Sequence, residues 1–104
     1  MKIKIFQGGY DKNLSYLLWC DKSKHAAIVD PAVNPLPIFE FIEYQKIYLS
    51  KIIITHSHYD HIKYLEDFIY KYNYAQICCH EKSINLYKHN NVKGLSDNEI
   101  IMLG

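Results

Sequence analysis

The pattern of apolar and polar residues predicts three strands at the start of the chain. Residues 2–6 (KIKIF) alternate between polar and apolar side chains, which is typical of a strand with one exposed face. Residues 14–20 (LSYLLWC) predict a second strand, and residues 21–24 (DKSK) predict a hairpin-type connection after it. Residues 26–30 (AAIVD) predict a third strand.

The rest of the chain alternates between predicted helices and strands. Apolar residues recur at helical spacing in residues 35–47 and 62–72, which predicts two amphipathic helices. The run 50–55 (SKIIIT) between them is nearly all apolar and predicts a short strand that is buried on both faces. The last predicted elements are a strand at 75–79, a helix at 81–89 and a strand at 98–103.

This order of elements predicts an α/β (α+β) fold, with a mixed sheet that carries helices on one face. At 104 residues the chain has the length of one domain, so we assign residues 1–104 to a single domain. The chain ends on an apolar predicted strand and Gly104, whereas a finished domain more often ends in a polar tail or a docked helix. We therefore expect a truncated domain.

Composition narrows the class of function. The chain has 12 basic and 11 acidic residues and a net charge of +1, so it has no strong field for nucleic acid or membrane. Every basic residue is lysine, and the chain therefore lacks the planar guanidinium fork that favours contact with phosphate or guanine. No segment is long and apolar enough for a signal peptide or a transmembrane helix. We expect neither a nucleic-acid partner nor a membrane partner.

The cysteines point to a reducing compartment. The chain has an odd number of cysteines, namely Cys20, Cys78 and Cys79, and their spacing is not that of a metal-binding motif. We interpret all three as small buried hydrophobic residues of a cytoplasmic protein.

The densest chemistry lies in residues 55–61 (THSHYDH), which follow an apolar run. His56, His58, Asp60 and His61 all carry side chains that bind zinc. In an extended segment, positions 56 and 58 project to one side, so His56 and His58 can bind one ion together. Asp60 and His61 follow where we expect the chain to turn, and they can point at a second ion nearby.

Such a site predicts metal-assisted hydrolysis. Two zinc ions that share a hydroxide lower the pKa of the water toward ~7 and stabilise a tetrahedral oxyanion. One alternative is a solvated, histidine-rich turn, and another is a serine triad, which alternation disfavours because it points Ser57 away from both histidines. We interpret His25, His80 and His89 as surface or core histidines, although His80 follows a strand and could approach the same sheet edge.

Residues 56–61 (HSHYDH) resemble the H-x-H-x-D-H signature of the metallo-β-lactamase superfamily. Upstream, residues 11–32 resemble the N-terminal hairpin of hydroxyacylglutathione hydrolases, the glyoxalase II branch. Downstream, residues 74–83 and 95–104 resemble later segments of the same domain, so the resemblance covers essentially the whole chain. The branch is less specific than the superfamily, because related lactonases, dioxygenases and thioesterases share much of this pattern.

The resemblance implies that the chain is the N-terminal half of an αββα sandwich. It also implies that His56 and His58 bind the first zinc ion and Asp60 and His61 the second, with iron or manganese as alternative metals. Metal-bound hydroxide would attack a small-molecule thioester, and Asp60 would help to handle protons. Asp30 would hold the metal loop from behind, the alternative being a turn aspartate at a strand end before proline.

Two departures from the family pattern leave the activity of this chain open. Lys63 and Tyr64 stand where the family usually carries glycines, and their side chains could crowd the metals or reshape the helix start. The family completes its site with a histidine, a bridging aspartate and a last histidine, all beyond Gly104.

We therefore carry two main hypotheses. The first is a zinc-dependent thioester hydrolase of the hydroxyacylglutathione type. The alternative is a catalytically inactive fragment or subunit that only binds metal, associates with itself or binds a complementary C-terminal half. A nucleic-acid-processing role, which some members of the superfamily have, is a third hypothesis.

Overall fold

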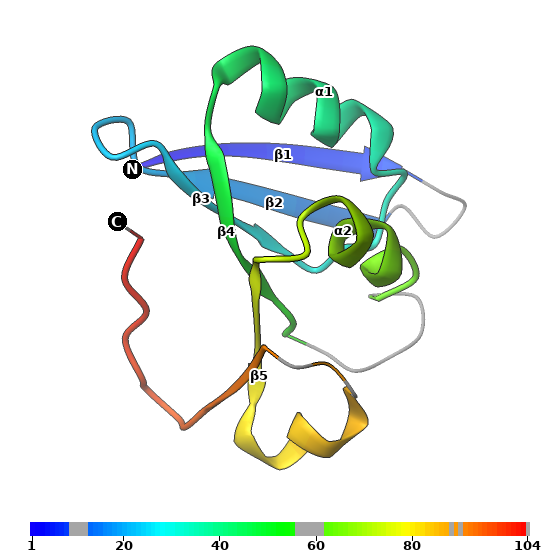
Figure 1. The fold of residues 1–104 in the computed structure, drawn as a ribbon, viewed down its shortest axis with the longest axis vertical. Coiled ribbons are helices and arrows are strands. Elements are labelled where there is room, and N and C mark those ends of the chain that lie inside the picture. Colours follow the sequence, from blue (N-terminus) through cyan, green and yellow to red (C-terminus); the bar gives the residue numbers. More distant parts are fainter. Residues whose placement is uncertain (9–12, 56–61, 88, 90, 104) are drawn as a thin grey trace.

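Six strands form one mixed sheet whose spatial order follows the order of the chain (Figure 1). The computed structural model describes residues 1–8, 13–55, 62–87, 89 and 91–103. The strands are β1 (Lys2–Gly8), β2 (Asn13–Trp19), β3 (His25–Val29), β4 (Tyr48–Ile53), β5 (Gln76–His80) and β6 (Val92–Leu95). The first three strands pair antiparallel, and β3 to β6 pair parallel. The parallel pairs require crossover connections, which contain α1 (Leu36–Gln45), α2 (Leu65–Lys71) and the 3₁₀ helix η2 (Glu81–Leu86).

The core lies between the helices and one face of the sheet. Both helices bury apolar side chains in a single cluster with the strands, namely Ile38 and Ile42 from α1, Leu65 and Phe68 from α2, and Leu17, Ile28, Ile52 and Ile77 from β2 to β5. The rings of Phe39 on α1 and Phe68 on α2 meet edge to face at 5.0 Å between centroids, so the two helices also contact each other. The predicted mixed sheet with helices on one face is confirmed.

The other face of the sheet is also apolar, most clearly on β1 and β2. Ile3 pairs with Leu18 and Ile5 with Tyr16, so these four side chains lie on the face away from the helices. Ile3 is 62% exposed and Ile5 is 56% exposed. Lys4 lies on the helix face instead, where its ammonium sits 5.2 Å from the centre of the Phe41 ring.

The apolar strand at 50–55 is correctly predicted, but its full burial on both faces is wrong. In β4, Leu49 and Ile52 are buried, whereas Lys51 and Ile53 are half-buried. The helices cover one side of β4. The opposite side of β4 belongs to the second face of the sheet, which is partly exposed.

The segment after β5 differs most from the prediction. The predicted helix at 81–89 is the shorter 3₁₀ helix η2, and the imidazole of His80 caps its start by accepting a hydrogen bond from the Lys82 amide at 3.1 Å. Strand β6 was not predicted, because its four residues are too short for a clear periodicity and include Gly94.

The predicted strand at 98–103 is wrong. The Glu99 amide donates to the carbonyl of Ser96 at 3.2 Å, and this turn ends the pairing of the chain with β5. Ile100, Ile101 and Met102 then border a cavity of about 210 Å³ together with Lys51 and Cys78, on the second face of the sheet. The apolar residues of this segment therefore lie beside the sheet instead of extending it.

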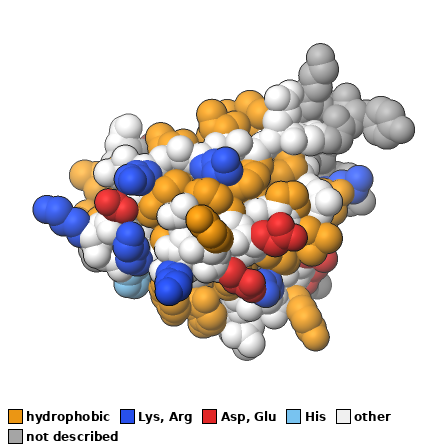
Figure 2. Space-filling view, turned by 90° about the horizontal axis from the view of Figure 1, so that it is seen from above, with side chains coloured by type: hydrophobic (Ala, Val, Ile, Leu, Met, Phe, Trp, Pro, Cys, Tyr) orange, Lys and Arg blue, Asp and Glu red, His pale blue; other side chains and the backbone are white. Residues whose placement is uncertain are grey.

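The surface seen from above Figure 1 mixes charges of both signs. Figure 2 shows lysine and acidic side chains interspersed among apolar ones, which agrees with the net charge of +1. Among the described residues, no helix reaches the length and apolarity needed to cross a membrane.

Candidate functional site

The predicted metal ligands His56, His58, Asp60 and His61 lie outside the described residues, so their roles stay predictions. We call residues 56–61 the histidine segment. The structure describes the residues on both sides of it, Thr55 and Ile62, and shows what holds each of them.

Asp30 holds the residue that precedes the histidine segment. Its carboxylate accepts a hydrogen bond from the Thr55 amide at 2.8 Å and a second, short one from the Thr55 hydroxyl. Asp30 is itself only 6% exposed, so a buried anion fixes both the backbone and the side chain of Thr55. The predicted place of Asp30 behind this segment agrees with these contacts, while its effect on a metal stays a prediction.

The backbone around Asp30 also forms hydrogen bonds with other segments of the chain. Asp30 has a φ of 56°, a left-handed conformation that aspartate tolerates better than most residues. Its amide donates to the Ile53 carbonyl at 2.8 Å. The buried hydroxyl of Ser15 donates to the Asp30 carbonyl and accepts from the Ala32 amide at 3.1 Å. Sequence reasoning missed Ser15, although a serine in the apolar run LSYLLW was a signal.

The strand topology brings several polar groups to one edge of the sheet. Strands β3, β4 and β5 are parallel, so Asp30, Thr55 and His80 all lie where these strands end. The carboxyl ends of parallel strands are the usual place for a binding site in an open α/β sheet. The histidine segment starts at this edge because it follows Thr55 directly.

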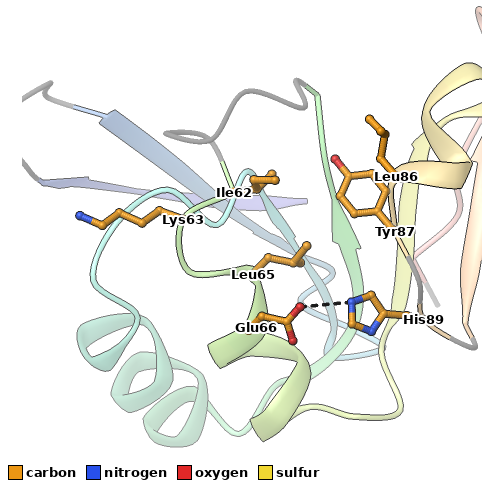
Figure 3. A pocket seen from close by; sticks show the side chains of 7 residues that line it. All are labelled: Ile62, Lys63, Leu65, Glu66, Leu86, Tyr87 and His89. Carbon is orange, nitrogen blue, oxygen red and sulfur yellow. Dashed lines mark ion pairs between the residues drawn. The ribbon is translucent and has the colours of Figure 1, made fainter.

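A cavity of about 510 Å³ begins at the first described residue after the histidine segment (Figure 3). Its lining begins with Ile62, which comes directly after His61 in the sequence. The predicted helix at 62–72 starts only at Leu65, and the Tyr64 amide just before it donates to the Pro31 carbonyl at 3.0 Å. The residues before the helix are therefore tied to the end of β3, close to Asp30.

The other three histidines each contact a described residue. His80 lies 3.2 Å from the Asp97 carboxylate, His89 lies 3.3 Å from the Glu66 carboxylate, and His25 packs edge to face on Tyr48. Within the ranges that the structure describes, no three His, Cys, Asp or Glu residues come together in a metal-binding group. The interpretation of these three histidines as surface or core residues stays a prediction.

The three cysteines are free thiols, in environments of two kinds. Hydrogen bonds from the Ser23 side chain and backbone lower the pKa of Cys20 to about 7. Burial raises the pKa of Cys78 and of Cys79. The prediction of small buried hydrophobic residues fits Cys78 and Cys79, whereas Cys20 is only half-buried.

The profile of the metallo-beta-lactamase superfamily matches residues 8–89 of the chain. The chain belongs to this superfamily. This membership confirms the resemblance drawn from the histidine segment, and the match includes Asp30, Thr55 and the cavity side of α2.

Similar proteins of this superfamily include several hydrolases. A protein of Schizosaccharomyces pombe named "Probable hydroxyacylglutathione hydrolase" is 36% identical over 103 residues, covering 92% of this chain and 37% of its own length. A Bacillus subtilis protein named "Probable polyketide biosynthesis zinc-dependent hydrolase" is 29% identical over 94 residues, covering 88% of this chain and 41% of its own length. The crystal structure of a metallo-beta-lactamase from Staphylococcus aureus covers all of this chain with a TM-score of 0.81 and 26% identity, using 32% of its own length.

These similarities show the fold of the chain and how much of each relative's length it covers. The sheet and helices have the metallo-beta-lactamase fold, and the similar proteins are hydrolases by name. The chain spans less than half the length of each of these relatives.

The donor set of the histidine segment fits a metal ion of this superfamily. Three imidazoles and one carboxylate within six residues are ligands that suit zinc, iron or manganese. Asp30 places a buried carboxylate on Thr55, the residue directly before this segment.

Proposed function

We propose that this chain carries part of the active site of a zinc-dependent hydrolase that cleaves thioesters of the hydroxyacylglutathione type. The proposal rests on the two hydrogen bonds that the Asp30 carboxylate accepts from Thr55, the residue directly before His56. If the histidine-rich segment were only a solvated turn, it would not need a buried carboxylate at a strand end to fix its start.

The names of similar proteins support the choice of substrate and metal. The Schizosaccharomyces pombe relative is named a hydroxyacylglutathione hydrolase, and its similarity extends over nearly all of this chain. The Bacillus subtilis relative is named a zinc-dependent hydrolase. We therefore choose zinc over iron or manganese, and a thioester over a lactam or a lactone.

In this proposal the residues of the chain divide the work. His56 and His58 hold one zinc ion, and Asp60 and His61 hold a second. Zinc in such a site supplies a low-pKa water and a positive charge for the developing oxyanion. Asp60 would help to handle protons at this site, and Asp30 keeps the start of the ligand segment in one conformation through Thr55.

We further propose a cytoplasmic location. The chain has three free thiols and no disulfide between them. A reducing compartment keeps such thiols free.

The test is hydrolysis of a 2-hydroxyacyl glutathione thioester by the purified, zinc-loaded chain. We expect turnover above the buffer rate, and its loss in His58→Ala but not in the matched variant His25→Ala. Bound zinc without turnover would leave the ligand assignment standing and contradict the activity of this chain. Equal turnover in His58→Ala and the parent chain would contradict the assignment itself.

The alternative is an inactive fragment or subunit that completes its fold through a partner, and one observation favours it. Ile3, Ile5 and Leu14 are exposed on the same face of β1 and β2, away from the helices. An apolar sheet face of this kind associates readily, with a second copy of the chain or with a complementary C-terminal half.

A further inference from the structure

The cavity beside α2 has the size and position of a substrate pocket. Its volume of about 510 Å³ lies within the range of about 300–1,000 Å³ that is usual for small-molecule sites. One wall is the start of α2, and the other is the segment that follows η2 (Figure 3). Ile62, in the lining of this cavity, is the first described residue after the histidine segment and directly follows His61 in the sequence.

The interior of this cavity is mainly apolar. Figure 3 shows Ile62, Leu65 and Tyr87 facing one another across the space between the two walls. Leu65 and Tyr87 are buried in the core cluster, so this surface is fixed before any ligand arrives. Such a lining suits the hydrocarbon part of an acyl group.

Besides the Tyr87 hydroxyl, a pair of charged or polar side chains interrupts this apolar lining (Figure 3). His89 Nε2 lies 3.3 Å from Glu66 Oε1, which joins the two walls across the cavity. The side chain of His89 is 27% exposed and that of Glu66 is 78% exposed, so the carboxylate sits at the mouth. One oxygen of Glu66 is engaged by His89, and a carboxylate has a further oxygen that can accept a hydrogen bond from a ligand.

The charges around the cavity select against an anionic ligand group. The carboxylate of Glu66 repels a second carboxylate. Lys63 also lines the cavity, but its side chain extends away from the interior, and its ammonium lies 5.5 Å from the centre of the Tyr64 ring. A hydrogen-bond donor, such as a hydroxyl, is the kind of group that the Glu66 carboxylate accepts.

We propose that this cavity binds the acyl part of the substrate, and that Glu66, positioned by His89, recognises a hydroxyl on an otherwise apolar acyl chain. This inference rests on the proposed function, because it assigns the substrate specificity of that same site. It makes Glu66 a specificity-determining residue and His89 a positioning residue. Neither belongs to the histidine segment.

The test measures binding without hydrolysis. The amides of 2-hydroxyhexanoic acid and of hexanoic acid are titrated into the metal-free 104-residue chain, and the backbone amide signals of Ile62, Leu65 and Tyr87 are followed by NMR. We expect both amides to shift these signals, with the hydroxylated one binding about three- to tenfold more tightly, as one hydrogen bond to an exposed charged group allows. Glu66→Ala and His89→Ala should remove that preference.

Matched variants control for charge and for fold. Asp67→Ala removes an acidic residue from the same first turn of α2 without touching the cavity, and His80→Ala removes a histidine that also pairs with a carboxylate. Both should keep the preference. Equal binding of the two amides, signal shifts elsewhere, no binding, or a preference that survives in Glu66→Ala would overturn the proposal. These titrations contain no metal, so a chain that fails to hydrolyse thioesters yet prefers the hydroxylated amide contradicts only the proposed function.

Discussion

At the scale of single residues, Asp30 joins the end of β3 to the start of the histidine segment. Asp30→Ala removes the two carboxylate oxygens that accept hydrogen bonds from Thr55. We expect the zinc affinity of the chain to fall about 10- to 100-fold, the usual cost of losing a group that orients metal ligands. Zinc competition with a chromophoric chelator measures the change.

A control separates this effect from a general loss of stability. Asp21→Ala removes an exposed aspartate, whose partners are surface lysines, and should leave zinc affinity unchanged. An Asp30→Ala chain that stays folded and binds zinc as the parent does would show that Asp30 is only a turn residue.

Cys20 gives a prediction that depends on pH. Its pKa is lowered to about 7 by hydrogen bonds from Ser23, so the thiolate forms as the pH rises through 7. We expect iodoacetamide to label Cys20 with a midpoint near pH 7 and faster than Cys78 or Cys79, as read by peptide mass spectrometry. Ser23→Ala should move the midpoint upward. Equal labelling of all three thiols, or an unchanged midpoint in Ser23→Ala, would contradict the assignment.

At this scale the sequence was informative where the chemistry is local. Asp30 stood out through the resemblance to the metallo-β-lactamase superfamily, while its place at a strand end before proline suggested only a turn residue. The structure shows that its carboxylate accepts hydrogen bonds from Thr55. Ser15 did not stand out, because its role depends on Asp30 and Ala32, which are 15 and 17 residues away in the sequence. Glu66 and His89 likewise meet only through the fold.

At the scale of elements, β6 and η2 depend on one glycine. A Cβ added at Gly94 would lie 2.9 Å from the Cα of Glu81, closer than real side chains allow. We expect Gly94→Ala to lower the free energy of unfolding by about 1–3 kcal/mol, because η2 must move away from β6. Urea denaturation measures the change.

Gly8 provides the matched substitution. A Cβ at Gly8 would lie 3.6 Å from Val33, an ordinary contact, so Gly8→Ala should change the free energy of unfolding by less than about 0.5 kcal/mol. If the two variants unfolded at the same urea concentration, the close packing of η2 on β6 would be refuted.

The elements themselves were predicted well where the pattern was long. The strands at 2–6, 14–20, 26–30 and 75–79 and the helix at 35–47 were confirmed within a few residues of their ends. The errors came after β5, where short segments take their structure from partners. The apolar residues near 100–102 suggested a strand. Apolar side chains alone do not supply the neighbouring strand with which a strand must form hydrogen bonds. In the structure these residues lie beside the second face of the sheet.

At the scale of the whole molecule, the exposed apolar face of β1 and β2 bears on whether the chain is a monomer or associates. The alternative proposal predicts self-association through Ile3 and Ile5, because burying them removes apolar surface from water. We expect analytical ultracentrifugation to show species larger than the monomer, and Ile5→Lys to shift them toward the monomer.

A leucine on the helix side is the control for that substitution. Leu36 is 61% exposed, close to the 62% of Ile3, but it lies on α1. Leu36→Lys should leave the distribution of species unchanged. A parent chain that sediments as a monomer at all concentrations, or an equal effect of Leu36→Lys, would argue against association through this face.

The central claim is that the histidine segment binds the metal of this superfamily hydrolase. Its most direct test is zinc content after equilibrium dialysis, read by atomic emission for the parent chain, the double variant His56→Ala/His58→Ala, and the control His25→Ala. We predict that the parent and the control retain zinc and that His56→Ala/His58→Ala does not. Zinc retained equally by all three chains, or by none of them, would contradict the account.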